Sequence, residues 1–354
     1  MLKNVSHGDP EFMRLFSLDA ARGISALCIV LFHLYSGLGI INDFFIFVDF
    51  FFVLSGFVLA SSVFKIEGMN QIKAFVWNRY VRLFPMAYSA LLFVVAIQVV
   101  VILRYSISGR ELPNSIPLDL FTILASVLFL QVFYAKSQLL LYPLWSLSVE
   151  WIANLLSVFL SWVSIRNKIL FFIFLGTLFV AISMKLDFHF AFQQFTNQSG
   201  RGLFGFGLGL LTWNVREAII RFNQKVILFV LVFMMPMLAL FVNEKSEGTA
   251  IFISPILFSV MIWALFRLEA HCGILPPIGI CRFLGRMSYG VYVWHVVGTN
   301  LVALAKENWR LDFLDPQSFL GLPRLIMVLF LTLILTELTL RFVEIPLRKR
   351  LSHV

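Results

Sequence analysis

The sequence predicts an all-α integral membrane protein with about ten transmembrane helices and one re-entrant or interfacial segment. Hydrophobic residues make up 60% of the 354-residue chain and charged residues only 13%, whereas soluble domains carry about 25% charged residues. The mean hydropathy is +0.90, and long apolar runs recur from one end to the other. These observations place the chain in a bilayer. The net charge of +9 is spread between the apolar runs, which is the pattern of membrane topology rather than of nucleic-acid binding.

The apolar runs set the candidate spans. They cover approximately residues 16–41, 44–64, 84–103, 119–134, 143–165, 169–184, 200–214, 226–242, 249–266, 284–305 and 323–343. Several are shorter than the roughly 20 residues that a spanning helix needs. Apolar length alone therefore does not decide the number of spans.

The basic connections between the apolar runs indicate the number of spans, because cytoplasmic loops are enriched in Lys and Arg. The basic stretches are 65–82, 166–168, 216–225, 267–286 and the C-terminal end. If all are cytoplasmic together with the N-terminus, an even number of spans must separate each from the next. The interval 83–165 holds three runs, so 119–134 is expected to be re-entrant or interfacial. Ten spans remain, with both termini cytoplasmic.

The chain is expected to form a single membrane domain over residues 13–354. Residues 1–12 are polar and without pattern, and they are interpreted as a leader added ahead of a natural start at Met13. No secretory signal peptide is expected, because the first apolar run is too long for one. Cys28, Cys272 and Cys281 have no metal-type spacing, so neither a metal site nor a disulfide framework is predicted.

Arg22 and His33 are the most informative pair in the first apolar run. On an α-helix the step between them turns about 1100°, so the two side chains share a face about 16 Å apart along the axis. If Arg22 lies at one membrane surface, His33 lies near the midplane. Ionisable residues at that depth are costly and mark functional sites. The alternative is a buried His bonded to a neighbouring helix.

Arg79 and Arg82 end the first basic stretch in the segment NRYVRLFP. Side chains three apart lie on the same face of a helix, and two guanidinium groups can hold phosphates bidentately. Pro85 is then expected in the first turn of the next span. The alternative for the two arginines is topological charge with contact to anionic lipid.

Two carboxylates lie within or beside the spans. Asp49 lies about two turns from the outer end of the second run, where it either pairs with a membrane His or Arg or reaches water. Glu150 lies in YPLWSLSVEW, where it shares a helix face with Ser146 and can orient a His or an acceptor hydroxyl. In the same segment, Trp145 is either part of a sugar-stacking wall or part of an interfacial aromatic belt.

His295 lies about 13 Å from the cytoplasmic end of its run, counted from Arg286. That depth matches the depth of His33, although a structural hydrogen-bonding role is also open. One apparent motif is rejected. The segment GRGLFG at 200–205 fits a dinucleotide-binding fingerprint, but no strand precedes it, and Gly205 and Gly209 indicate tight helix packing.

These segments, taken together and in order, resemble the membrane acyltransferase-3 family, which includes O-antigen, exopolysaccharide and Nod-factor O-acetyltransferases. The matching segments are LDAARGISALCIVLFH, VDFFFVLSGF, RYVR, WSLSVEW and SYGVYVWH. They lie between residues 18 and 295. The resemblance implies about ten spans in a bacterial inner membrane, an acyl-CoA donor on the cytoplasmic side, and a carbohydrate acceptor on the far side. Some members carry an extra esterase-like domain, and this chain resembles the stand-alone kind.

The resemblance also implies roles for the candidate residues. Arg22, Arg79 and Arg82 would hold the phosphates of acetyl-CoA, and no metal would be involved. His33 would act as general base on the acceptor hydroxyl or carry the acyl group briefly. Glu150 or Asp49 would orient His33 or the acceptor. The remaining candidates would contact the acceptor, a surface or lipid-linked carbohydrate: Trp145, Ser148 and His295.

A proton-coupled transporter is the main alternative, because buried His and carboxylate side chains also form proton relays. A transporter would often contain an inverted internal repeat. The two His-bearing segments, FHLYSG and VWHVVG, have unlike flanks and give no sign of one. A scaffold or sensor function would not explain the arginines and His33. Acetylation of a sugar by the purified protein would discriminate between these classes.

Overall fold

The computed structural model describes residues 15–35, 39–109, 120–133, 140–141, 143–185, 190–217, 227–228, 247–271, 276–309, 311, 313 and 321–351. Throughout these ranges the regular secondary structure is helical, without a strand, and the all-α prediction is confirmed there. The expected leader, Cys272 and most of the run 226–242 lie outside the described residues.

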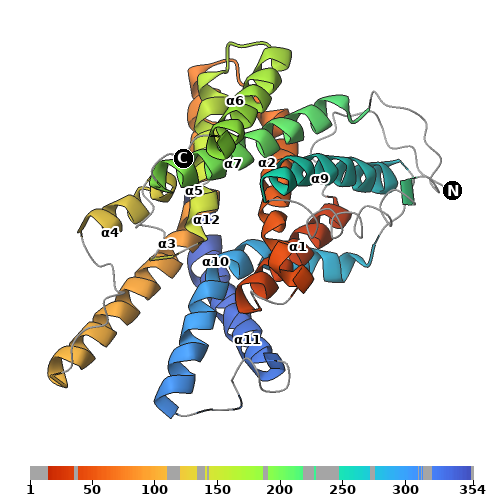
Figure 1. Ribbon diagram of the computed structural model, residues 1–354. Helices are drawn as coiled ribbons and strands as arrows, with labels where there is room; N and C mark the ends of the chain where they lie inside the picture. Colours follow the sequence, from red (N-terminus) through yellow and green to blue (C-terminus); the bar gives the residue numbers. More distant parts are fainter. Residues whose placement is uncertain are drawn as a thin grey trace.

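The helices vary widely in length (Figure 1). The long ones are α1 (Phe16–Leu34), α2 (Phe47–Val63), α3 (Met69–Ile107), α5 (Leu144–Phe159), α6 (Ile165–Lys185), α7 (Phe190–Val215), α9 (Glu247–Ala270), α10 (Ile278–Trp309) and α11 (Leu322–Thr339). The short ones are α4 (Leu120–Val127), α12 (Ile345–Leu351), the 3₁₀ turns η1 (Gly39–Ile46) and η2 (Gln131–Phe133), and the π-helical turn η6 (Leu340–Glu344).

Six described helical segments are long and apolar enough to cross a membrane. They are Phe16–Leu34, Ile41–Val63, Met69–Ile107, Ile165–Lys185, Ala250–Ala270 and Leu322–Leu351. The protein is therefore a multi-pass membrane protein. The described part of the run 119–134 contains the 8-residue helix α4, and its re-entrant or interfacial character stays a prediction. The total of ten spans and the orientation of the termini stay predictions.

The helices pack in two groups, one formed by α2, α6, α7 and α9 and the other by α1, α10 and α11, and α1 connects the groups through its contacts with α2 and α9. The most extensive contacts join α6 to α7, α7 to α2, α1 to α10, and α10 to α11. Figure 1 shows α6 and α7 together at the top and α10 beside α11 at the bottom. Glycine permits the closest approaches, as expected in a membrane protein. A Cβ added to Gly209 of α7 would lie 2.1 Å from the Val53 carbonyl oxygen of α2, and one added to Gly285 of α10 would lie 2.4 Å from Asp19 of α1.

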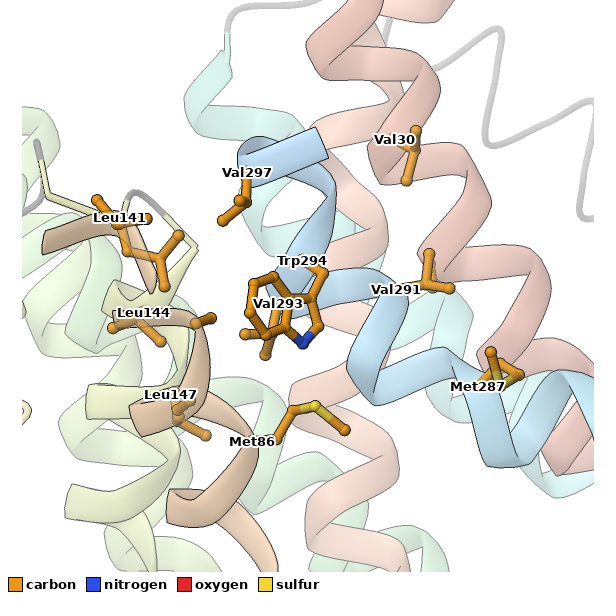
Figure 2. Close-up of a cluster of buried hydrophobic side chains, with 14 of the residues drawn as sticks. Val30, Met86, Leu141, Leu144, Leu147, Met287, Val291, Val293, Trp294 and Val297 are labelled. Atoms are coloured by element: carbon orange, nitrogen blue, oxygen red, sulfur yellow. The ribbon is translucent and has the colours of Figure 1, made fainter. Parts of the chain in front are cut away.

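A large buried apolar cluster lies between α1, α3, α5 and α10. Figure 2 shows Trp294 of α10 at its centre, with Leu144 and Leu147 of α5 on one side and Val30 and Val291 toward the other. Since lipid tails are as apolar as these side chains, close packing rather than escape from water holds them together. The cluster fixes the position of α10, and with it the position of His295.

The expectation for Pro85 is wrong. Pro85 lies inside α3, which begins at Met69, so most of the basic stretch 65–82 is helical rather than a loop. A proline removes one backbone hydrogen bond from a helix interior. The helix continues because Phe75, Val81 and Phe84 on the preceding turns are buried.

Hydrogen bonds join several described residues of the basic stretches expected on the cytoplasmic side to the ends of other helices. The indole of Trp77 donates to the Leu351 carbonyl at 2.9 Å, and the Lys168 ammonium donates to the Val63 carbonyl at 3.2 Å. The amide of Phe16 donates to Glu269 at 2.8 Å. These contacts join α3 to α12, the start of α6 to the end of α2, and the start of α1 to the end of α9, as expected if these helix ends lie on one side of the membrane.

Candidate functional site

Two cavities lie within the bundle, and they differ in chemistry. The first, here called the arginine cavity, has a volume of about 560 Å³ and is enclosed by α1, α2, α3, α5, α10, η6 and α12. The second, here called the histidine cavity, has a volume of about 510 Å³ and is lined by residues of α1, η1, α2, α5, α7, α9 and α10. Arg22 lines the first cavity and His33 lines the second. One helix, α1, thus contributes an ionisable group to each cavity.

Six guanidinium groups line the arginine cavity. They belong to Arg22, Arg79, Arg82, Arg282, Arg286 and Arg348. Three carboxylates share the wall, from Asp19, Glu150 and Glu344, so positive charge is in excess. The remaining wall is largely apolar and includes Phe51, Leu54 and Met86. A cavity of this kind suits a ligand with several phosphate groups and an apolar arm.

Acidic neighbours orient several of these arginines. Arg22 lies 3.8 Å from Asp19, and Arg348 lies 3.6 Å from Glu344. Arg286 bonds Glu337 at 2.9 Å. The carboxylate of Glu150 accepts from the Ser55 hydroxyl at 2.8 Å, which fixes it on the α2 side of the cavity. Three of the six guanidinium groups, those of Arg22, Arg286 and Arg348, therefore have an acidic neighbour that orients them.

The C-terminal part of the chain completes the arginine cavity. The π-helical turn η6 brings Leu340 and Glu344 to the wall, and α12 adds Arg348. Such turns occur frequently at functional sites. Sequence reasoning treated Arg282, Arg286 and Arg348 as topological charge and missed Glu344. The available signal was position, since all four belong to stretches expected at the same membrane surface as Arg22.

The histidine cavity is aromatic and polar. His33 shares its wall with Phe32, Phe45 and Trp145 on the aromatic side. Polar lining comes from Asn42, Asp43, Asn197, Arg201 and Tyr292. Aromatic faces beside hydrogen-bonding side chains fit a ligand that has both apolar ring faces and many hydroxyl groups.

His295 lies directly behind His33. The two imidazole rings are stacked, with 5.0 Å between centroids and 29° between planes, so the equal depths expected from sequence bring the two side chains together. His295 is fully buried, and its Nδ1 lies 2.8 Å from the Tyr292 carbonyl oxygen. Because a carbonyl can only accept, we assign the hydrogen of the neutral ring to Nδ1. Its Nε2 has no hydrogen-bond partner within the described part of the chain.

Asp49 forms a buried ion pair with Arg201. The carboxylate accepts from Arg201 Nε at 2.9 Å and Nη2 at 3.1 Å, and from the Ser254 hydroxyl at 2.9 Å. The guanidinium also lies against the rings of Phe45 and Trp145, 5.3 and 5.8 Å from their centroids. Asp49 thus positions Arg201, which faces the histidine cavity.

Sequence reasoning missed Arg201 because the segment GRGLFG was assigned to helix packing alone. The packing assignment itself is correct, since a Cβ added to Gly202 would lie 2.1 Å from Val149. The signal that could have found Arg201 was its charge within an apolar run, at the start of 200–214, where an ionisable group marks a functional site.

The predicted site residues fall into three places. Arg22, Arg79, Arg82 and Glu150 line the arginine cavity, whereas His33 and Trp145 line the histidine cavity, with His295 behind it. Ser148 lines neither cavity. Its hydroxyl donates to Gln131 at 2.7 Å and so ties α5 to η2.

The two cavities meet at Val48 and Tyr292, which line both. The Tyr292 hydroxyl lies 2.6 Å from the Ser146 hydroxyl, so a hydrogen bond between α10 and α5 crosses this junction. A ligand held by the arginines that extends through this junction toward His33 would pass these side chains.

Comparison with known proteins identifies the family. A family model described as an acyltransferase domain, of the acyltransferase-3 type, matches residues 15–340. The chain is 26% identical to the peptidoglycan O-acetyltransferase OatA of Listeria monocytogenes across 94% of its own length. That alignment covers 56% of OatA, so the chain spans about half the length of this relative. No solved structure matches the chain. The match covers nearly all of the membrane bundle and the lining of both cavities except Glu344, Ile345 and Arg348, and the chain therefore belongs to the membrane acyltransferase-3 family.

Proposed function

We propose that the protein is an integral-membrane O-acetyltransferase. It takes an acetyl group from acetyl-CoA bound in the arginine cavity and transfers it to a carbohydrate hydroxyl bound in the histidine cavity. The observation that supports this proposal most directly is that a cavity lined by six arginines meets a cavity lined by aromatic and polar side chains inside one bundle. The O-acetyltransferase title of the Listeria relative supports the same reaction class.

The donor fits the arginine cavity by charge and by shape. Coenzyme A carries three phosphate groups on its nucleotide end and a long, mostly apolar arm. Arg79 and Arg82 present guanidinium groups that can hold phosphates bidentately, and the other four arginines surround them. The apolar part of the wall extends to Tyr292, so the arm can lie along it toward the junction of the two cavities. Because the basic end of the bundle is expected on the cytoplasmic side, the donor enters from the cytoplasm.

The acceptor fits the histidine cavity. Trp145 and Phe45 offer apolar faces for a sugar ring, and Asn42, Asn197 and Arg201 offer hydrogen bonds. A polymeric or lipid-linked surface carbohydrate, reaching in from the outer side of a bacterial inner membrane, is the acceptor class that we assign.

His33 is the catalytic base in this proposal. Its ring nitrogen takes the proton of the acceptor hydroxyl as the hydroxyl oxygen attacks the thioester carbonyl carbon. The carbon–sulfur bond breaks, and the thiolate of coenzyme A receives the proton. A transient acyl-His33 intermediate would use the same residues. His295 positions His33, and the Asp49 carboxylate positions Arg201. Glu150 orients the donor in the arginine cavity.

Transfer of radiolabel from acetyl-CoA to carbohydrate tests the proposal. The purified protein in lipid nanodiscs should form an acetylated product, whereas a transporter would form no new covalent bond. The variant His33→Ala should lose about 10²–10⁴-fold in turnover, the usual contribution of a general base. As a matched control, His271→Ala changes a partly exposed histidine beyond the end of α9 that lines neither cavity, and it should keep wild-type turnover.

Two outcomes would contradict this proposal. One is a wild-type protein that forms no acetylated product from acetyl-CoA. The other is wild-type turnover in a well-folded His33→Ala variant.

A further inference from the structure

We propose that Tyr292 is a catalytic residue, and that its hydroxyl donates a hydrogen bond to the thioester carbonyl oxygen during transfer. This inference rests on the proposed function. Besides Val48, Tyr292 is the one described residue that lines both cavities. The thioester must lie where donor and acceptor meet, and of the two side chains at that junction only tyrosine carries a polar atom.

The Tyr292 hydroxyl is held at the junction by two contacts. It lies 2.6 Å from the Ser146 hydroxyl and 3.2 Å from the Pro143 carbonyl oxygen, to which it can donate. The Ser146 hydroxyl also reaches that carbonyl, at 3.0 Å. Because Ser146 can keep the Pro143 carbonyl as its acceptor, Tyr292 can turn its proton to a substrate oxygen without leaving Pro143 unsatisfied.

The aromatic ring and the backbone of Tyr292 are also fixed. Phe51 of α2 packs against the ring, with 5.7 Å between centroids. The Tyr292 carbonyl accepts from Nδ1 of His295, whose ring stacks on His33. One turn of α10 therefore places a hydroxyl at the junction and supports the general base beside it. Such preorganised donors stabilise charge that develops in a transition state.

The balanced step assigns each atom. The acceptor oxygen bonds to the thioester carbonyl carbon and its proton passes to His33. Negative charge develops on the carbonyl oxygen, where the Tyr292 hydroxyl donates to it. The carbonyl then reforms as the carbon–sulfur bond breaks, and the proton passes from His33 to the sulfur of coenzyme A. The products are an acetyl ester and free coenzyme A, and Tyr292 keeps its proton throughout.

Other polar groups near the junction are less suited to this role. Ser146 lines only the arginine cavity, and its hydroxyl donates to a carbonyl of its own helix turn. Arg201 lines only the histidine cavity, and Asp49 holds its Nε and Nη2.

Tyr292→Phe tests the inference, because it removes the hydroxyl and keeps the ring that packs against Phe51. We expect kcat to fall about 10²–10³-fold, as when one oxyanion donor is removed, with coenzyme A affinity within about twofold of wild type. The matched control is Tyr88→Phe, which loses a hydroxyl bonded to the Val127 carbonyl and lines neither cavity. It should keep wild-type kcat.

Ser146→Ala separates catalysis from structure. It breaks the same interhelical hydrogen bond, so a purely structural role for that bond predicts equal losses in Ser146→Ala and Tyr292→Phe. The inference predicts a much larger loss in Tyr292→Phe. Equal losses, or wild-type kcat in Tyr292→Phe, would overturn the inference while the proposed function stands. A wild-type protein that forms no product from acetyl-CoA would overturn both.

Discussion

The Asp49 carboxylate accepts hydrogen bonds from both Arg201 and Ser254, and Asp49 is fully buried. The sequence predicted that Asp49 either pairs with a membrane His or Arg or reaches water. It could not select the partner, because Arg201 lies 152 positions away on a helix assigned to packing alone. By contrast, Arg22 and His33 lie on one helix, where the helical repeat alone relates them. Their spacing along α1 therefore follows from local sequence, whereas their places in two different cavities depend on the helices that pack around α1.

Asp49→Ala should strongly destabilise the protein, because it leaves the Arg201 charge buried without its partner. The expected loss is about 3–5 kcal/mol, seen as a lower melting temperature in detergent. The double variant Asp49→Ala with Arg201→Met should be more stable than Asp49→Ala alone, since no charge is then stranded. Asp43→Ala serves as the control, because no ion pair of Asp43 is recorded in the described part of the chain. If Asp49→Ala melts with the wild type, the ion pair does not stabilise the fold.

Helix packing depends on small residues at crossing points, and the sequence signal for these was partly readable. Gly205 and Gly209 predicted close packing of their helix, and the contact with α2 confirms it. The partner helix was not predictable, because a small-residue pattern does not specify which helix approaches it. Pro85 shows the opposite failure. Proline prefers the first turn of a helix, but here the buried side chains on either side of Pro85 keep α3 continuous.

Gly209→Ala should destabilise the α2–α7 contact. The new methyl group would lie 2.1 Å from the Val53 carbonyl and 2.6 Å from the Phe57 amide nitrogen, so backbone must move. Overpacking of this kind costs about 1–3 kcal/mol, measurable as a lower melting temperature. Gly279→Ala is the matched control, since nothing lies within 4 Å of its added Cβ and alanine favours helix by roughly 0.5–1 kcal/mol. Equal melting of both variants would mean that α2 and α7 are not in tight contact.

At the scale of the whole molecule, six arginines from α1, from the stretches 65–82 and 267–286, and from the C-terminal end surround one cavity. The sequence predicted that these stretches share one side of the membrane, because the distribution of Lys and Arg between spans reports sidedness. The sequence could not predict that α3, α10 and α12 enclose one cavity, because local sequence patterns do not specify the order of helices around a bundle. The junction at Tyr292 was hidden for the same reason.

The central claim is a division of labour in which one cavity binds the donor and the other performs the transfer. Calorimetric titration of coenzyme A into four proteins tests it most directly: wild type, Arg79→Ala with Arg82→Ala, His33→Ala, and Arg104→Ala. The last is a control on α3 that lines neither cavity. A hydrogen bond to a charged group contributes roughly 1.5–3 kcal/mol, so the double variant should bind at least about tenfold more weakly. His33→Ala and Arg104→Ala should bind as the wild type does. Unchanged affinity in the double variant, or an equal loss in His33→Ala, would contradict the claim.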